Sequence, residues 1–140
     1  MRVVLSDDLE ELKERVIGCA ITVHRFLGPG LLESMYQDCL AIELRVAGLT
    51  VERERRVHLE YRGHPVGAPL KVDLVVDDRL IVEVKAVERL HPVHLAQVIT
   101  YLKLTGFPTG LLMNFNATTL RAGLRTAVHP DLYKPPPRFG

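Results

Sequence analysis

Two acidic residues and a lysine lie on two neighbouring apolar segments of the chain. Asp73 belongs to residues 70–76, and Glu83 and Lys85 belong to residues 80–86. Both segments are rich in valine and are separated by only three polar residues. This pattern is typical of two antiparallel strands joined by a tight turn.

The register of this hairpin decides whether the charged groups meet. If Val76 pairs with Leu80, Asp73 lies opposite Glu83, and Lys85 shares the face of Glu83 because side chains alternate along a strand. The sequence therefore predicts three charged groups at one place. The opposite face is predicted to be wholly apolar, with Val72, Leu74, Val76, Leu80, Val82, Val84 and Ala86.

The repulsion between two carboxylates that lie opposite each other must be offset by a neighbouring positive charge. Carboxylates on opposite strands have Cβ atoms about 5 Å apart, and they repel each other by roughly 3 kcal/mol at an effective dielectric constant near ~20. Bound between them, a divalent cation would remove this repulsion, and oxygen ligands favour Mg²⁺ or Mn²⁺ over zinc. The alternative is a buried ion-pair cluster, with Lys85 against Glu83 and Lys71 or Arg79 against Asp73. The hairpin alone leaves both interpretations open.

Other parts of the chain carry a family resemblance. The spacing Asp-x9-Glu-x-Lys resembles the signature of the PD-(D/E)XK nuclease superfamily. Gly30, Glu33 and Tyr36 match the defining positions of the GxxExxY protein family, a small-domain branch of that superfamily. The resemblance covers about residues 14–129, and the other segments that carry it are residues 23–30, 83–88 and 97–102.

The resemblance implies metal-assisted hydrolysis of phosphodiester bonds. Asp73, Glu83 and the Val84 carbonyl would hold Mg²⁺ or Mn²⁺, and Glu33 would complete the site or help to bind a second ion. Lys85 would orient the attacking water or stabilise developing charge.

Three further residues are expected around this site. Gln97 and Tyr101 are spaced to face one direction from a helix, and the resemblance gives Gln97 a part in positioning water or phosphate. We expect Tyr36 and Tyr101 to support the site by packing or hydrogen bonding. For Tyr101, a plain place in the core is the alternative.

Charge limits the choice of partner. The net charge of +1 excludes the strongly basic surface of a tight duplex binder, so a nucleic acid, DNA before RNA, would be held by local patches. Arg53, Arg55 and Arg56 are candidate contacts, although their alternation with Glu52 and Glu54 favours a solvated edge strand. Two other functions stay open. One is a non-catalytic module that binds nucleic acid or a protein partner, and the other is a binder of nucleotides or other phosphorylated small molecules.

The pattern of elements predicts an α/β (mixed α+β) fold with a restriction-endonuclease-like core, in which helices flank a central mixed sheet in the order ααβββαβ(β). Asp8 and Glu11 resemble a capping box at the first helix. We expect one domain over residues 1–140, with a core at about 8–129 and a proline-rich tail at 130–140. The predicted helices are 8–27, 31–47 and 92–105, and the predicted strands are 51–61, 70–76, 80–86, 110–115 and 123–128.

Composition is typical of a cytoplasmic protein. Hydrophobic residues make up 47% of the chain, which is enough for one core. No apolar stretch approaches the ~20 residues that span a bilayer, and the first residues lack the features of a signal peptide. The two cysteines form no C-x-x-C motif, and we expect them to be structural thiols.

We predict that the protein is a homodimer, because a small domain that grips a long substrate doubles its contact surface by pairing. The first helix, the strand at 110–115 or the tail at 133–139 would supply the interface. Light scattering at tens of micromolar should give twice the mass of one chain. The mass of a single chain at that concentration would contradict the prediction.

Overall fold

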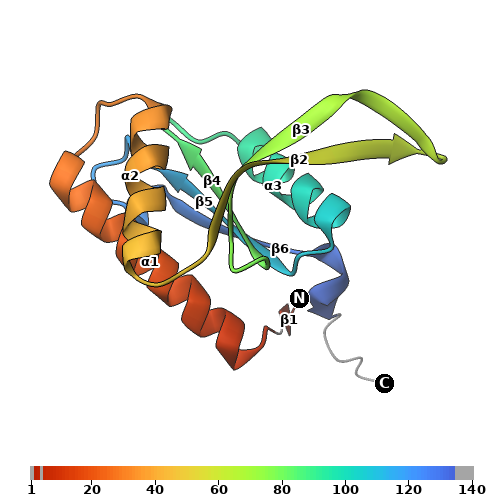
Figure 1. The fold of residues 1–140 in the computed structure, drawn as a ribbon, viewed down its shortest axis with the longest axis horizontal. Coiled ribbons are helices and arrows are strands. Elements are labelled where there is room, and N and C mark those ends of the chain that lie inside the picture. The colour runs from red at the N-terminus through yellow and green to blue at the C-terminus, as the bar shows by residue number, and fades with distance from the viewer. Residues whose placement is uncertain (1, 4, 135–140) are drawn as a thin grey trace, which may run out of the picture.

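A five-stranded mixed sheet with helices on both faces forms the body of the molecule (Figure 1). The computed structural model describes residues 2–3 and 5–134. This architecture confirms the predicted fold class. The helices are α1 (Asp7–Leu27), α2 (Glu33–Val46) and α3 (Pro92–Thr105), and the sheet strands are β2 (Val51–Tyr61), β3 (His64–Val76), β4 (Leu80–Lys85), β5 (Thr109–Asn114) and β6 (Leu124–Val128).

The strands follow one another across the sheet in the order β2-β3-β4-β5-β6. β4 and β5 are parallel, and the other neighbours are antiparallel. Helix α3 makes the crossover that a parallel pair requires, as predicted, and β2 is the predicted edge strand. A second, two-stranded sheet joins β1 (Arg2–Val3) to β7 (Tyr133–Lys134), and strands this short were not predicted because they show no periodicity.

Apolar residues cover both faces of the sheet. One core cluster joins α1 and α2 to one face, through residues such as Val16, Leu40 and Val82. The other cluster joins α3 to the opposite face, through residues such as Val98 and Ile81. Because β4 is buried on both sides, its sequence is almost continuously apolar. The acidic Glu83 and the terminal Lys85 are the exceptions within this strand.

Most helix ends lie within two residues of the predicted positions, because local sequence signals determine where a helix begins and ends. The predicted capping box of Asp8 with Glu11 is wrong, because the cap is Ser6, whose side chain accepts a hydrogen bond from the Leu9 N–H at 3.2 Å. Asp8 therefore lies in the first turn, where the helix dipole favours its charge. Helix α2 begins at Glu33 rather than at residue 31.

A two-stranded arm projects from the body where β2 and β3 continue beyond the rest of the sheet (Figure 1). Its residues 58–69 are all exposed. The strand pairing shifts between Val57 and Leu59, opposite the left-handed Gly67 with φ of 67°. The arm thus adds an extended surface without adding to either core.

Three expectations from the sequence concern other parts of the chain. No helix within the described residues is long and apolar enough to cross a membrane. Cys19 and Cys39 are both free thiols and half-buried. Residues 135–140 of the predicted proline-rich tail lie outside the described residues.

Helix α3 approaches β5 closely at Gly110, and we predict that Gly110→Ala destabilises the fold by about 1–3 kcal/mol, the usual cost of overpacking. A Cβ atom there would lie 2.8 Å from Cγ1 of Val98, a β-branched side chain that cannot easily rotate away within a helix. Gly18→Ala is the control. No atom lies within 4 Å of that added Cβ atom, so the helix should gain up to about 1 kcal/mol. Urea unfolding measures both changes, and equal stability of the two variants would contradict the prediction.

Candidate metal centre

Strands β3 and β4 separate at the acidic pair. The antiparallel ladder runs from Val76 opposite Leu80 to Leu74 opposite Val82, which confirms the predicted register. One residue further on, Asp73 and Glu83 face the gap that opens between the strands. The hairpin therefore brings the two carboxyl groups together at its open end.

Each carboxyl group accepts a backbone hydrogen bond from the opposite strand. The Asp73 N–H donates to Oε1 of Glu83 at 2.9 Å, and the Val84 N–H donates to Oδ2 of Asp73 at 2.8 Å. The side chains thus take the place of the carbonyl groups that would continue the ladder. These bonds fix the direction of both carboxyl groups.

At the same point the regular alternation of side chains along β3 is interrupted. Glu54 has a left-handed φ of 51°, and the ladder passes from Arg53–Leu74 to Arg55–Val72 without a pair between them. Leu74 belongs to the core beneath α1 and α2. Val72, in contrast, belongs to the core beneath α3. The prediction that Val72 shares the face of Leu74 is wrong, because strict alternation requires extended backbone throughout.

Burial is the main cause of the unusual electrostatics of the pair. It raises the pKa of Asp73, and burial together with the nearby negative charge of Asp73 raises the pKa of Glu83 to about 8. Lys85 lowers both pKa values, but less strongly. Among the described residues, no cationic side chain lies within 4.0 Å of either carboxyl group. The buried ion-pair cluster with Lys71 or Arg79 is therefore not formed.

Tyr101 brings α3 to the same place. Burial raises the pKa of its phenol to about 12, with further contributions from the charges of Glu83 and Asp73. The hydroxyl group therefore stays protonated and remains able to donate a hydrogen bond. Tyr101 is also part of the core beneath α3, which was the alternative expected for it. Its support of the site stays a prediction.

Glu54 is an acidic neighbour that the sequence did not reveal. Its negative charge contributes to the raised pKa of Asp73. Alternation of arginine and glutamate along residues 52–56 suggested only solvated charge. Nothing local in the sequence indicated a left-handed glutamate beside the pair.

Two predicted residues, Glu33 and Gln97, have exposed side chains. Glu33 is not among the charges that shift the pKa values of Asp73 and Glu83. Across the described part of the chain, no three histidine, cysteine or acidic residues form a group that could hold a metal ion. The structure therefore brings together the Asp73–Glu83 pair with Lys85 nearby, and roles for Glu33 and Gln97 remain proposals.

Tyr36 holds the loop between α1 and α2. Its hydroxyl group donates to the Gly28 carbonyl at 2.5 Å and accepts from the Leu31 N–H at 3.1 Å. Its ring stacks on Phe115 with centroids 4.8 Å apart. The hydroxyl group is thus engaged with this loop, and support of the site by Tyr36 stays a prediction.

Asn114, at the end of β5, fixes the chain that leaves the site. Its side chain accepts from the Val87 N–H at 3.0 Å and donates to the Val87 carbonyl at 2.9 Å. The Lys85 carbonyl accepts from the Phe115 N–H at 2.9 Å. Sequence analysis missed Asn114, since its partners are distant in the chain.

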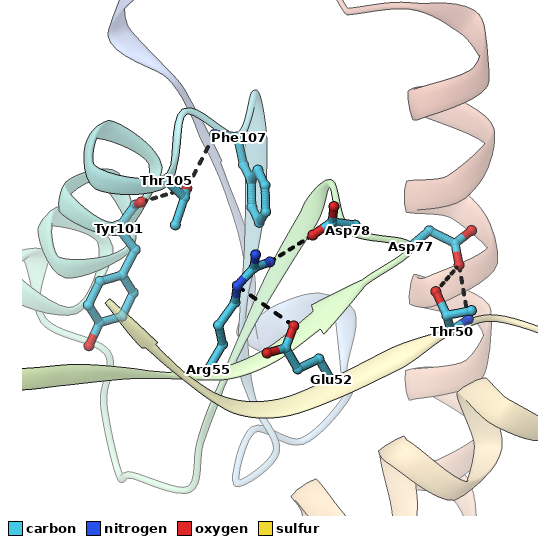
Figure 2. Close-up of polar contacts among 8 residues, drawn as sticks. All are labelled: Thr50, Glu52, Arg55, Asp77, Asp78, Tyr101, Thr105 and Phe107. Atoms are coloured by element: carbon cyan, nitrogen blue, oxygen red, sulfur yellow. Dashed lines mark hydrogen bonds and ion pairs between the residues drawn. The ribbon is translucent and has the colours of Figure 1, made fainter. Parts of the chain in front are cut away.

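The arginines of β2 have partners within the protein. Figure 2 shows Arg55 between Asp78 and Glu52, at 2.8 and 3.7 Å, with its guanidinium group 5.3 Å from the centre of the Phe107 ring. Arg53 pairs with Asp38 of α2 at 2.6 Å. Arg56 is exposed and has no ion-pair partner among the described residues. Of the three arginines, Arg56 is therefore the one whose positive charge is not offset by a carboxylate within the described residues.

The donor set at the pair fits a divalent cation. The carboxyl groups of the buried Glu83 and the half-buried Asp73 share a small space, their orientation is fixed, and neither is neutralised by a contacting cation among the described residues. Mg²⁺ in proteins commonly binds through one or two carboxylates while it keeps several waters. The arrangement therefore suits Mg²⁺ or Mn²⁺ in chemical type.

Comparison with known proteins gives one match. A family model of the PD-(D/E)XK nuclease superfamily matches residues 10–127. The match includes the acidic pair and Lys85. No curated protein and no solved structure matches the chain.

We predict that the metal-free protein loses stability as the pH rises from about 5 to about 8, by up to about 1.4 kcal/mol per pH unit. The pKa of Glu83 is about 8 in the folded state, well above its ordinary value in an unfolded chain. In this window the folded state therefore holds a proton that the unfolded state has lost. The stabilisation is complete below the unfolded pKa and disappears above the folded pKa.

Glu83→Gln provides the comparison, because glutamine resembles the protonated acid and does not titrate. Its unfolding free energy in EDTA should vary less with pH, so that the variant becomes the more stable protein towards pH ~8. Urea unfolding at a series of pH values measures the difference. Parallel pH profiles for the two proteins would contradict the assignment.

Proposed function

The chain belongs to the PD-(D/E)XK nuclease superfamily, and on that basis we propose that it hydrolyses phosphodiester bonds of nucleic acid with Mg²⁺ or Mn²⁺. The observation that carries this proposal is the pair of the buried Glu83 and the half-buried Asp73, which have raised pKa values and no cation in contact among the described residues. A fold gains nothing in stability from such a pair. The excess negative charge of the pair would, however, favour the binding of a divalent cation.

We assign Asp73, Glu83 and the Val84 carbonyl as the metal ligands. The bound ion would lower the pKa of a water molecule and neutralise charge that builds on the phosphate. Because their hydrogen bonds to backbone amides hold both carboxyl groups in place, little reorganisation is needed on binding. Glu33 is our candidate for an outer ligand that acts through water.

Lys85 is our candidate for the group that meets the substrate. It lies at the end of β4, on the face of Glu83, and its charge is sensed by both acids. From there it would orient the attacking water or stabilise the developing oxyanion. Gln97 and Tyr101 lie on α3, and we propose that they position water and phosphate beside the ligands.

The substrate and assembly follow as narrower proposals. Gly30, Glu33 and Tyr36 support membership of the GxxExxY family. DNA is the proposed substrate, and the exposed arm and Arg56 offer surface for its backbone. A homodimer would double that surface.

Metal-dependent cleavage tests the proposal directly. The wild type should cut at least one of plasmid DNA, single-stranded DNA, branched DNA and RNA with Mg²⁺ or Mn²⁺, and EDTA should stop the reaction. Glu83→Gln and Lys85→Ala should each lower the rate by at least about a hundredfold. Glu14→Gln, at an exposed glutamate of α1, is the matched control and should cut like the wild type.

Thermal unfolding separates metal binding from chemistry. Mg²⁺ should raise the melting temperature of the wild type and of Lys85→Ala, because it binds the folded state selectively. Glu83→Gln should gain far less. If neither metal stabilises the wild type and no substrate is cut, the acids are not a metal site and the proposal fails.

A further inference from the structure

A second concave site lies away from the acidic pair, between the end of α1 and residues 116–121. It is an open pocket of about 550 Å³, within the size range of small-molecule sites. Arg25, Arg121, Thr118 and Thr119 contribute polar groups, and Ile21 and Pro29 contribute apolar surface. The proposed cleavage chemistry makes no use of this pocket.

The pocket has an excess of positive charge. No acidic residue lines it. Within the described residues, neither Arg25 nor Arg121 has a carboxylate within 4.0 Å. Guanidinium groups and hydroxyl groups together are the usual partners of phosphate. The pocket therefore selects an anion, and phosphate fits its donors.

The walls of the pocket are held in place before any ligand binds. Nε2 of the buried His24 lies 2.9 Å from the Ala117 carbonyl, so this nitrogen must carry the proton, because a carbonyl oxygen only accepts. The Gly30 N–H donates to Oδ1 of Asn116 at 3.1 Å. These bonds tie α1 and the turn after it to the segment after β5.

The same segment connects the pocket to the acidic site. Nδ2 of Asn116 donates to the Val87 carbonyl at 3.4 Å, and Val87 follows Lys85 by two residues. Both sites thus lie where the parallel strands β4 and β5 end. Ligands commonly bind beyond the carboxyl ends of parallel strands.

We propose that this pocket binds a nucleoside monophosphate unit, with its phosphate on Arg25 and Arg121 and its base or sugar on the apolar surface of Ile21 and Pro29. The unit has two sources, a free mononucleotide or the phosphorylated end of a strand. Their shared chemistry matches a pocket that is lined by two guanidinium groups and by apolar side chains. Binding there needs neither the metal nor cleavage.

Binding is measured in EDTA, with calorimetry for dAMP and inorganic phosphate and with fluorescence anisotropy for a labelled thymidine octanucleotide. The octanucleotide is used with and without a 5′-phosphate. The double variant Arg25→Gln/Arg121→Gln should weaken binding of the phosphorylated ligands by at least about tenfold. Arg45→Gln/Lys103→Gln removes the same charge from exposed positions outside the pocket and the arm, and it should change binding less than about twofold.

The ligands distinguish the two sources. A free mononucleotide is identified if dAMP binds at least as tightly as the 5′-phosphorylated octanucleotide, and a strand end if only the phosphorylated octanucleotide binds. The inference is overturned if inorganic phosphate binds as tightly as both, or if the two double variants behave alike. Should the double variant not fold, Arg121→Gln, whose side chain is exposed, decides the matter by the same criteria. Because no metal is present, this result is independent of the cleavage assays.

Discussion

The reciprocal hydrogen bonds between Asp73 and Glu83 and the backbone of the opposite strand are the interaction on which the rest of the structure depends. If β3 and β4 stayed paired beyond Leu74 and Val82, both carboxyl groups would lie either within a packed face of the sheet or on its surface. Here one oxygen of each carboxyl group accepts a hydrogen bond from a backbone N–H at the point where the strands part. Beyond that point β4 continues alongside β5, whereas β3 accompanies β2 into the arm. The separation that forms the site also creates the arm.

Electrostatics explains why this junction is suited to chemistry. Burial and mutual repulsion favour a proton on the pair, and they raise the pKa of Glu83 to about 8. The backbone amides oppose this effect only in part. A proton and a divalent cation would therefore compete for the same carboxyl oxygens. The phenol of Tyr101 lies close enough that the charges of Glu83 and Asp73 contribute to its raised pKa. The folded protein keeps a charge imbalance that only a bound ion or a proton removes.

The loops at the ends of β4 and β5 are organised by side chains rather than by regular structure. Asn114 binds the backbone of Val87, Tyr36 binds the turn after α1, and His24 binds the segment after β5. Through Asn114 and Asn116, the segment that leads to the pocket is bonded to the backbone of Val87, two residues after Lys85.

The sequence by itself determined the order of the elements, the crossover, the register of the central hairpin and the meeting of Asp73 with Glu83, because periodicity and turn chemistry are local properties that the residues carry with them. Tertiary structure decided what depends on distant neighbours. It placed a left-handed Glu54 beside Asp73, moved Val72 to the other face, gave Arg53 and Arg55 their acidic partners, and left Glu33 exposed. Asn114 acquired its role in the same way, through a partner 27 residues away in the chain. Such contacts exist only when the sheet closes, since burial and the backbone groups left unpaired at a strand end are set by packing and not by sequence spacing.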